Sequence, residues 1–350
     1  MVVCRDQHEK VEDYISLLFR KDEHEFFRFM RVTKDTFKSL IKILEEGEHF
    51  NPERPHSTGP RPTAANTALA VTLWYLGNMC SQRDVAERFH ISQGHACYLI
   101  NVVVDALCDQ GPSVIVWPSF SDINAIEAEF KEFANFPGIV GAIDGCHVQA
   151  IVPDDVQSDY LDRNHNHSVN LMAVCDAQKK FTYCFAGYPG SIHDQRVFAN
   201  STLGQSLTET SNIHFPSKYY HIVGDSAFML HTHVMVPYKD NVALTVSQMN
   251  FNKRLSQSRR VIENAFGLLK GRFRRLRRLE CALEHVSKTI TACCVLHNVT
   301  IGNAFEIDLL MSNDADETAC ASESETNRVS VHATAAATLK RDTIAHNLLQ

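Results

Sequence analysis

The sequence predicts an α/β protein, in which a segment of strands and helices follows a helical N-terminal region. Three observations support this prediction. Apolar residues recur at helical spacing up to about residue 112, strand-like apolar runs begin at Gly138, and helical spacing returns after a strand at 221–223. The 350 residues, 44% hydrophobic and 21% charged, exclude a mainly disordered, collagen-like or coiled-coil chain. Two compact units are expected, since one domain takes ~100–200 residues.

Residues 1–62 are expected to form a helical region that ends in a linker. Thr33 is a candidate N-cap for a helix, because a threonine side chain accepts a hydrogen bond from the first turn. Four of the eleven prolines crowd the stretch 52–62 and predict a loop or linker there.

Residues 63–112 show a helix-turn-helix pattern. Ser81 begins an S-x-x-D capping box, the turn lies at His90 and Ile91, and Ser92 caps the next helix. This second helix contains no Lys or Arg. Three of its polar residues are candidates for contacts with base edges: Gln93, His95 and Asn101. A helical subdomain that never contacts DNA remains the alternative.

Residues 136–305 are expected to form the sheet-containing domain. The apolar run 139–143 predicts a strand that ends at Asp144, and a hairpin is predicted over 169–175 and 181–186. A short helix follows at 194–200. A late helix carries its apolar residues on one face: Ile262, Phe266, Leu269, Phe273 and Leu276.

The ends of the chain and its cysteines restrict the class of protein. Residues 313–350 form an acidic tail, poor in large apolar residues, and are expected to be disordered or weakly helical. We expect no membrane association and no secretory signal, because no apolar run approaches the ~18 residues of a membrane span. The eleven scattered cysteines contain no CxxC pair and indicate a reducing compartment.

Positive charge is concentrated in one segment. The chain carries a net charge of −7, but residues 253–278 contain ten basic residues and one acid, Glu263. The sequence therefore predicts one basic element rather than a generally basic surface. The run 270–278 is typical of a DNA-facing helix or of a nuclear localisation signal. Within the basic element, the candidates for phosphate contacts are Arg259, Arg260, Lys270 and Arg272.

Four carboxylates are candidates for a metal site. Asp144 and Asp225 each follow a short apolar strand, and two such carboxylates repel each other unless a divalent cation lies between them. Glu263 lies beside the apolar face of its helix, and Asp194 begins a helix. Each has an ordinary alternative role. The aspartates 144 and 225 can be loop residues, Glu263 can pair with Arg259 for ~0.2–0.5 kcal/mol, and Asp194 can be a helix N-terminal charge.

Four carboxylates suit two hard cations, Mg²⁺ or Mn²⁺. Such cations would lie ~3.5–4 Å apart, one activating water or a 3′-hydroxyl and the other stabilising the leaving oxygen of a phosphodiester. The acids therefore predict a metal-dependent nuclease or strand-transfer enzyme without a covalent intermediate.

Several motifs together resemble the PIF/Harbinger transposase family and the domesticated Harbinger transposase-derived nucleases of animals. They occur in family order between about residues 68 and 298. The motifs are GAIDGCHV around Asp144, YPGSIHDQRVF around Asp194, VGDSAF around Asp225, RRVIENAFGLLKGRF around Glu263, and CCVLHN ending at Asn298.

The resemblance implies an RNase H-like fold of the DDE transposase and integrase type, a mixed sheet flanked by helices, with an acidic triad. It assigns Asp144, Asp225 and Glu263 as catalytic, with Asp194 as an additional metal ligand; Asp194 as the second triad member is the alternative. Arg163 is implied as a phosphate contact, although the lysine of the family pattern Y-x-x-R-K is missing after it. A Myb-like DNA-binding partner and a nuclear location, with the cytoplasm as a second location, are implied as well. The oligomeric state, including a homo-oligomer, is left open.

These observations lead to two hypotheses of different class. The first is a Mg²⁺- or Mn²⁺-dependent endonuclease of transposase origin that acts on DNA phosphodiester bonds. The second is a catalytically silent DNA- or protein-binding module that retains the fold. RNA as the substrate is a third reading, which the resemblance disfavours.

Overall fold

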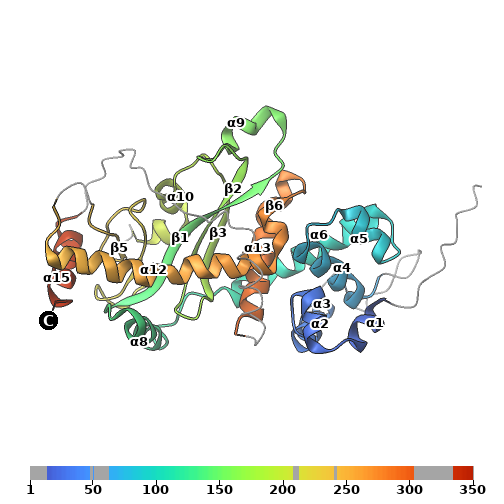
Figure 1. Ribbon diagram of the computed structural model, residues 1–350, viewed down its shortest axis with the longest axis horizontal. Helices are drawn as coiled ribbons and strands as arrows, with labels where there is room; N and C mark the ends of the chain where they lie inside the picture. The colour runs from blue at the N-terminus through green and yellow to red at the C-terminus, as the bar shows by residue number, and fades with distance from the viewer. Residues whose placement is uncertain are drawn as a thin grey trace, which may run out of the picture.

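The computed structural model describes residues 14–47, 50, 63–207, 213–239, 243–302 and 334–349. A helical region lies at one end of the molecule, a sheet with its helices occupies the centre, and the helix nearest the C-terminus lies at the other end (Figure 1). The fold is therefore the predicted one, a mixed sheet flanked by helices after a helical N-terminal region.

The helical region consists of short helices whose starts follow the capping signals in the sequence. Thr33, Ser81 and Ser92 all accept the hydrogen bonds expected of N-caps, and Ser81 forms the full capping box with Asp84. Each such cap contributes about 1 kcal/mol. The helices are α1 (Tyr14–Arg20), α2 (Glu23–Met30), α3 (Lys34–Glu46), α4 (Ala65–Gly77), α5 (Gln82–Arg88), α6 (Gln93–Asp109) and α7 (Gly111–Val114).

The sheet has six strands. Strand order is β3-β2-β1-β4-β5, with β6 pairing β1 outside this path. The first three strands are antiparallel neighbours, whereas β4 and β6 run parallel to β1, and β5 runs parallel to β4. The strands are β1 (Ile139–Ala150), β2 (Ser168–Cys175), β3 (Phe181–Pro189), β4 (His221–Val223), β5 (Val234–Met235) and β6 (Arg278–Leu279).

Strand β1 is longer than the sequence predicts. The predicted strand end at Asp144 is wrong, because β1 continues through Asp144 to Ala150 and pairs with β2 along this length. Its other edge is shared by two short strands, with β4 covering Ile139–Ala142 and β6 covering Gln149 and Ala150. Between them, part of the β1 edge that includes Asp144 has no strand partner in the described chain.

Helices cover both faces of the sheet. The elements are α8 (Ile123–Ala134), η1 (Asp154–Val156), α9 (Gln157–Tyr160), α10 (Asp194–Asn200), α11 (Thr202–Ser206), α12 (Val246–Arg272), η2 (Arg274–Arg277), α13 (Leu283–Thr300) and α15 (Ala335–Asn347). Side chains alternate between the faces of a strand. Asp144 contacts α12, whereas a Cβ added to the next residue, Gly145, would meet α10, so these two helices lie on opposite faces. Helix α12 crosses the whole sheet (Figure 1).

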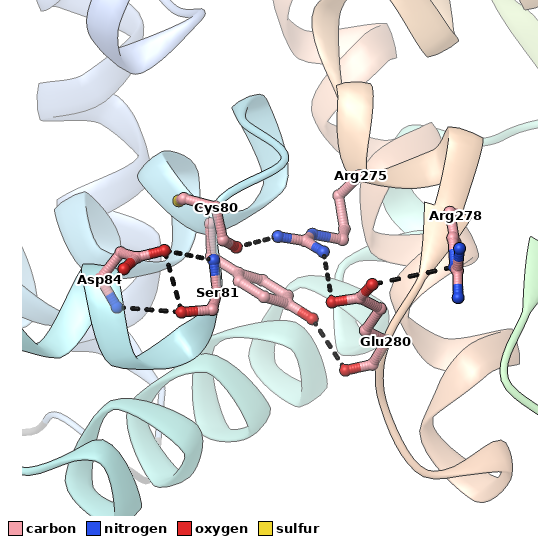
Figure 2. A network of polar contacts seen from close by, with 7 residues as sticks. Cys80, Ser81, Asp84, Arg275, Arg278 and Glu280 are labelled. Atoms are coloured by element: carbon pink, nitrogen blue, oxygen red, sulfur yellow. Dashed lines mark hydrogen bonds and ion pairs between the residues drawn. The ribbon is translucent and has the colours of Figure 1, made fainter.

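The basic run 270–278 is not the predicted DNA-facing helix. Helix α12 ends at Arg272, and Arg272 and Arg275 are both buried. Arg275 donates to the Cys80 carbonyl, pairs with Glu280 at 3.5 Å and stacks on Tyr75 at 4.4 Å, so it joins the helical region to the sheet domain (Figure 2). The charge count could not separate such structural arginines from exposed ones.

The acidic tail, expected to be disordered or weakly helical, contains a packed helix. Residues 303–333 lie outside the described residues, but 335–347 form α15, which packs against α12. Tyr238 donates to Asp342 of α15 at 2.6 Å, and the Arg341 guanidinium lies 4.0 Å from the Tyr238 ring centroid. The expectation of a disordered or weakly helical tail is therefore wrong for this segment.

Two further expectations concern other parts of the chain. The proline-rich linker at 52–62 lies outside the described residues. Among the described helices, no single one is long and apolar enough to cross a membrane, although α5 and α6 taken together, bent by 100°, reach that length and composition.

Candidate active site

Asp144 lies at the centre of an acidic cluster. It is buried on β1, its Oδ2 atom accepts a hydrogen bond from Arg259 of α12 at 2.9 Å, and its Oδ1 accepts from the Gly145 amide at 2.8 Å. Burial raises the pKa of Asp144 to about 7; Arg259 opposes this rise, whereas the nearby charges of Asp225 and Asp194 add to it. The three aspartates therefore share one electrostatic environment.

Asp225 follows β4, as predicted. Its Oδ1 accepts from the Ala227 amide at 2.9 Å, which fixes the carboxylate at the start of the loop. Burial raises its pKa, Arg259 lowers it, and Asp194 raises it. Asp144 and Asp225 thus share Arg259 as the same compensating cation.

Asp194 approaches these two aspartates from α10, over the opposite face of the sheet. It is buried and lies in the first turn of α10, so its ordinary alternative role as a helix N-terminal charge stays open. A Cβ added to Gly145 would lie 2.3 Å from Asp194 Oδ1. Only glycine at position 145 therefore leaves room for this carboxylate next to β1.

Asn170 holds the Asp194 carboxylate from β2. Its Nδ2 donates to Asp194 Oδ1 at 2.8 Å, and its side chain is fully buried. Its Oδ1 is buried without a hydrogen-bond partner among the described residues. A buried unsatisfied acceptor costs ~1–3 kcal/mol.

Glu263 is the most exposed of the four acids. Its side chain is 49% exposed, and its Oε1 atom lies 3.6 Å from Arg259. This i,i+4 ion pair is the ordinary alternative role expected for Glu263. The same guanidinium also contacts Asp144, so Arg259 bridges the acid on α12 and the acid on β1.

The donor set fits a hard divalent cation. All four acids supply carboxylate oxygens, the ligands that Mg²⁺ and Mn²⁺ prefer. Two of the acids have raised pKa values that a cation would lower again. Within the described residues, however, no group of three or more His, Cys, Asp or Glu side chains is arranged to hold a metal ion, and Arg259 lies between Asp144 and Glu263. Holding a cation with both of these acids would require Arg259 to move.

A pocket of about 160 Å³ adjoins the acids, and Asp194 forms part of its wall together with His147, Arg163 and His193. Asp162 shapes the loop that carries Arg163. Its Oδ1 accepts from the amides of Asn164 and Asn166, both at 2.9 Å. Arg163 is exposed and close enough to Asp225 to oppose the rise in its pKa.

The other predicted phosphate contacts divide into two groups. Arg260 is exposed, whereas Arg259 is 14% exposed and belongs to the acidic cluster. Lys270 donates to the His147 carbonyl at 2.7 Å and joins α12 to β1. The prediction for Arg272 is wrong, because its side chain is fully buried and donates to Thr300.

The predicted base-reading residues lie on α6, away from the acids. Gln93 is exposed. His95 Nε2 lies 2.7 Å from the Thr63 hydroxyl, and Asn101 is half-buried with its amide 3.9 Å from Cys97 Sγ. Helices α5 and α6 enclose 100° across a four-residue turn in which His90 has φ = 51°.

Residues 143–298 match the family model described as DDE superfamily endonuclease. This segment of the chain is therefore similar to DDE superfamily endonucleases. The rat protein "Putative nuclease HARBI1" is 29% identical over 292 residues, covering 80% of this chain and 82% of the relative. "Protein ALP1-like" of Arabidopsis thaliana is 26% identical over 295 residues, covering 80% of this chain and 71% of the relative. No solved structure matches the chain significantly.

These comparisons confirm the resemblance to Harbinger transposase-derived nucleases, and the sheet agrees with the RNase H-like fold of a DDE endonuclease. The matched segment, residues 143–298, contains all four candidate acids. Sequence reasoning missed Gly145 and Asn170 as neighbours of Asp194. An asparagine between Val169 and Leu171 in an apolar strand was the available signal, since a buried amide needs a partner.

Proposed function

We propose that this protein is a divalent-metal-dependent DNA endonuclease whose active site is formed by Asp144, Asp194, Asp225 and Glu263. One observation carries the proposal. Carboxylates from β1, α10 and the loop after β4 share one buried electrostatic environment, and Glu263 is linked to them through Arg259. A fold gains no stability from clustered buried carboxylates, so a cation-binding role explains them better than a structural one.

The four carboxylates would hold Mg²⁺ or Mn²⁺. When bound, such cations supply an activated water or 3′-hydroxyl and stabilise the leaving oxygen of the phosphodiester. The chain itself contributes the positions of the ligands: Gly145 admits Asp194, and the Ala227 amide orients Asp225.

The DNA strand would lie along the pocket next to Asp194. Arg163 is exposed on this pocket, and its guanidinium has the geometry to bind a phosphate through two hydrogen bonds. Arg260 is a second exposed cation, one residue beyond the arginine that contacts Asp144.

The arrangement of α5 and α6 supports a helix-turn-helix, whose helices typically enclose ~90–120°. Helix α6 contains no Lys or Arg, so its own affinity for phosphates would be weak. We therefore include in the proposal a separate Myb-like DNA-binding partner and a nuclear location, both implied by the family resemblance.

Cleavage of supercoiled plasmid DNA in Mn²⁺ tests the proposed function. We expect the wild-type protein to nick the plasmid in Mn²⁺ and not in EDTA. Asp144→Asn should lower the rate more than about 100-fold, beyond the effect of residues that only support metal ligands. The matched control is Glu284→Gln, which changes an acid whose side chain is 80% exposed on α13. Equal cleavage by Asp144→Asn and the control would contradict the assignment.

The silent binding module remains the second candidate, and the ion pairs of Arg259 favour it. They balance part of the acidic charge without any metal. A silent module would retard DNA in a mobility-shift assay but would leave the plasmid intact in Mn²⁺.

A further inference from the structure

Asn170 is a buried polar residue whose only side-chain hydrogen bond among the described residues is with Asp194. Strand β2 is buried along its whole length, and Asn170 is the only amide side chain in it. The residues on either side, Val169 and Leu171, are buried apolar side chains. An apolar side chain at this position would suit the strand without any hydrogen-bonding requirement.

The orientation of the amide follows from chemistry. An ionised carboxylate only accepts hydrogen bonds, so the amide group that faces Asp194 Oδ1 at 2.8 Å must be Nδ2. The amide oxygen then points elsewhere in the interior, where it has no partner among the described residues. Asn170 therefore satisfies Asp194 but leaves its own oxygen unsatisfied.

The position of Asp194 depends on two strands. Gly145 of β1 leaves the space that Asp194 Oδ1 occupies, and Asn170 of β2 binds this same oxygen atom. With Oδ1 held in this way, the carboxylate has one orientation, and Oδ2 is left as its second acceptor.

We propose that Asn170 is a positioning residue that orients Asp194 for cation binding, an inference that rests on the proposed metal-dependent function. Asn170 does not touch the cation in this scheme. It acts through Asp194, and its unsatisfied oxygen is the cost of having a donor at this position in an apolar strand.

Titration calorimetry with Mn²⁺ alone tests the inference, using the full chain without DNA. Asn170→Leu should weaken Mn²⁺ binding about 10–100-fold, the range for residues that orient metal ligands. The matched control is Asn252→Leu, since Asn252 bonds only the Tyr238 backbone, far along α12 from Glu263. This control should bind Mn²⁺ as the wild type does. Asn170→Ser, which shortens the side chain and keeps it polar, serves if the leucine variant does not fold.

A double-mutant cycle with Asp194→Asn separates positioning from general damage. If Asn170 acts through Asp194, Asn170→Leu weakens Mn²⁺ binding in the wild type and has no further effect in the Asp194→Asn background. Equal weakening in both backgrounds, or unchanged binding in the single variant, overturns the inference. If the wild-type protein binds no Mn²⁺, the proposed metal site fails first, and the role of Asn170 fails with it.

Discussion

At the scale of single residues, the candidate site depends on small features next to the acids. Gly145 admits Asp194, backbone amides orient Asp144 and Asp225, and Arg259 compensates the charge of both aspartates. The acids themselves could be predicted from the sequence because each lies in a recognisable motif. Their neighbours could not, since the contacts of Gly145 and Asn170 with Asp194 span 49 and 24 positions along the chain and form only when α10 packs against β1 and β2.

Gly145→Ala tests the space around Asp194. The added Cβ would lie 2.3 Å from Asp194 Oδ1, so the carboxylate must move, and we expect Mn²⁺ affinity measured by calorimetry to fall at least ~10-fold. Gly267→Ala on α12 is the matched control, because nothing lies within 4 Å of its added Cβ. The control should keep its Mn²⁺ affinity and gain about 0.5–1 kcal/mol in stability. Equal Mn²⁺ affinity in the two variants would show that the position of Asp194 is not constrained by Gly145.

At the scale of elements, capping residues and turns were predictable because their signals are local. Thr33, Ser81 and Ser92 are N-caps as expected, and β2 and β3 form the predicted hairpin. The extent of β1, the burial of Arg272 and Arg275, and the docking of α15 depend on partners distant in sequence. Arg272 bonds Thr300, Arg275 bonds the Cys80 carbonyl, and α15 is held by Tyr238. No local sequence pattern indicates these partners.

Arg275→Leu tests the junction shown in Figure 2. The variant loses the hydrogen bond to the Cys80 carbonyl and the stacking on Tyr75, and we expect unfolding in urea to show a loss of about 2–4 kcal/mol. Arg278→Leu is the control, since its side chain is 61% exposed and its pair with Glu280 is worth at most ~1 kcal/mol. A similar small loss in both variants would mean that Arg275 does not stabilise the junction.

The buried Lys340 should make the free energy of unfolding depend on pH. Its Nζ donates to the Thr232 carbonyl at 2.7 Å, and burial lowers its pKa from 10.5 to about 7, with His221, His231 and His233 as neighbouring titratable groups. Between pH 7 and 10.5 the unfolded chain therefore keeps a proton that the folded chain has lost. Stability should rise with pH across this window.

Lys340→Met should reduce this rise, because methionine cannot titrate. Unfolding in urea at about pH 7 and about pH 10 gives the free energies to compare. A smaller gain in the variant than in the wild type is the expected result. An equal gain in both proteins would assign the pH dependence to other groups.

At the scale of the whole molecule, a net charge of −7 coexists with a segment of net charge +9 over residues 253–278, part of which is buried. The proposed DNA binding would therefore rely on the exposed cations rather than on the whole basic segment. Arg163→Gln should make the negative slope of log K against log salt shallower by about 0.9, the value for one phosphate contact. Arg20→Gln on α1, an exposed arginine in the helical region far from the acids, should leave the slope unchanged (Figure 1). An unchanged slope in Arg163→Gln would exclude Arg163 as a phosphate contact.

The central claim is that acids from separate elements form one cation site. Its most direct test is calorimetric titration of Mn²⁺ into the wild-type protein and into Glu263→Gln, at low salt and without DNA, with Glu284→Gln as the control. We expect the wild type and the control to bind Mn²⁺ alike and Glu263→Gln to bind at least ~10-fold more weakly. Equal binding by all three proteins would place Glu263 outside the site and contradict the proposed set of ligands.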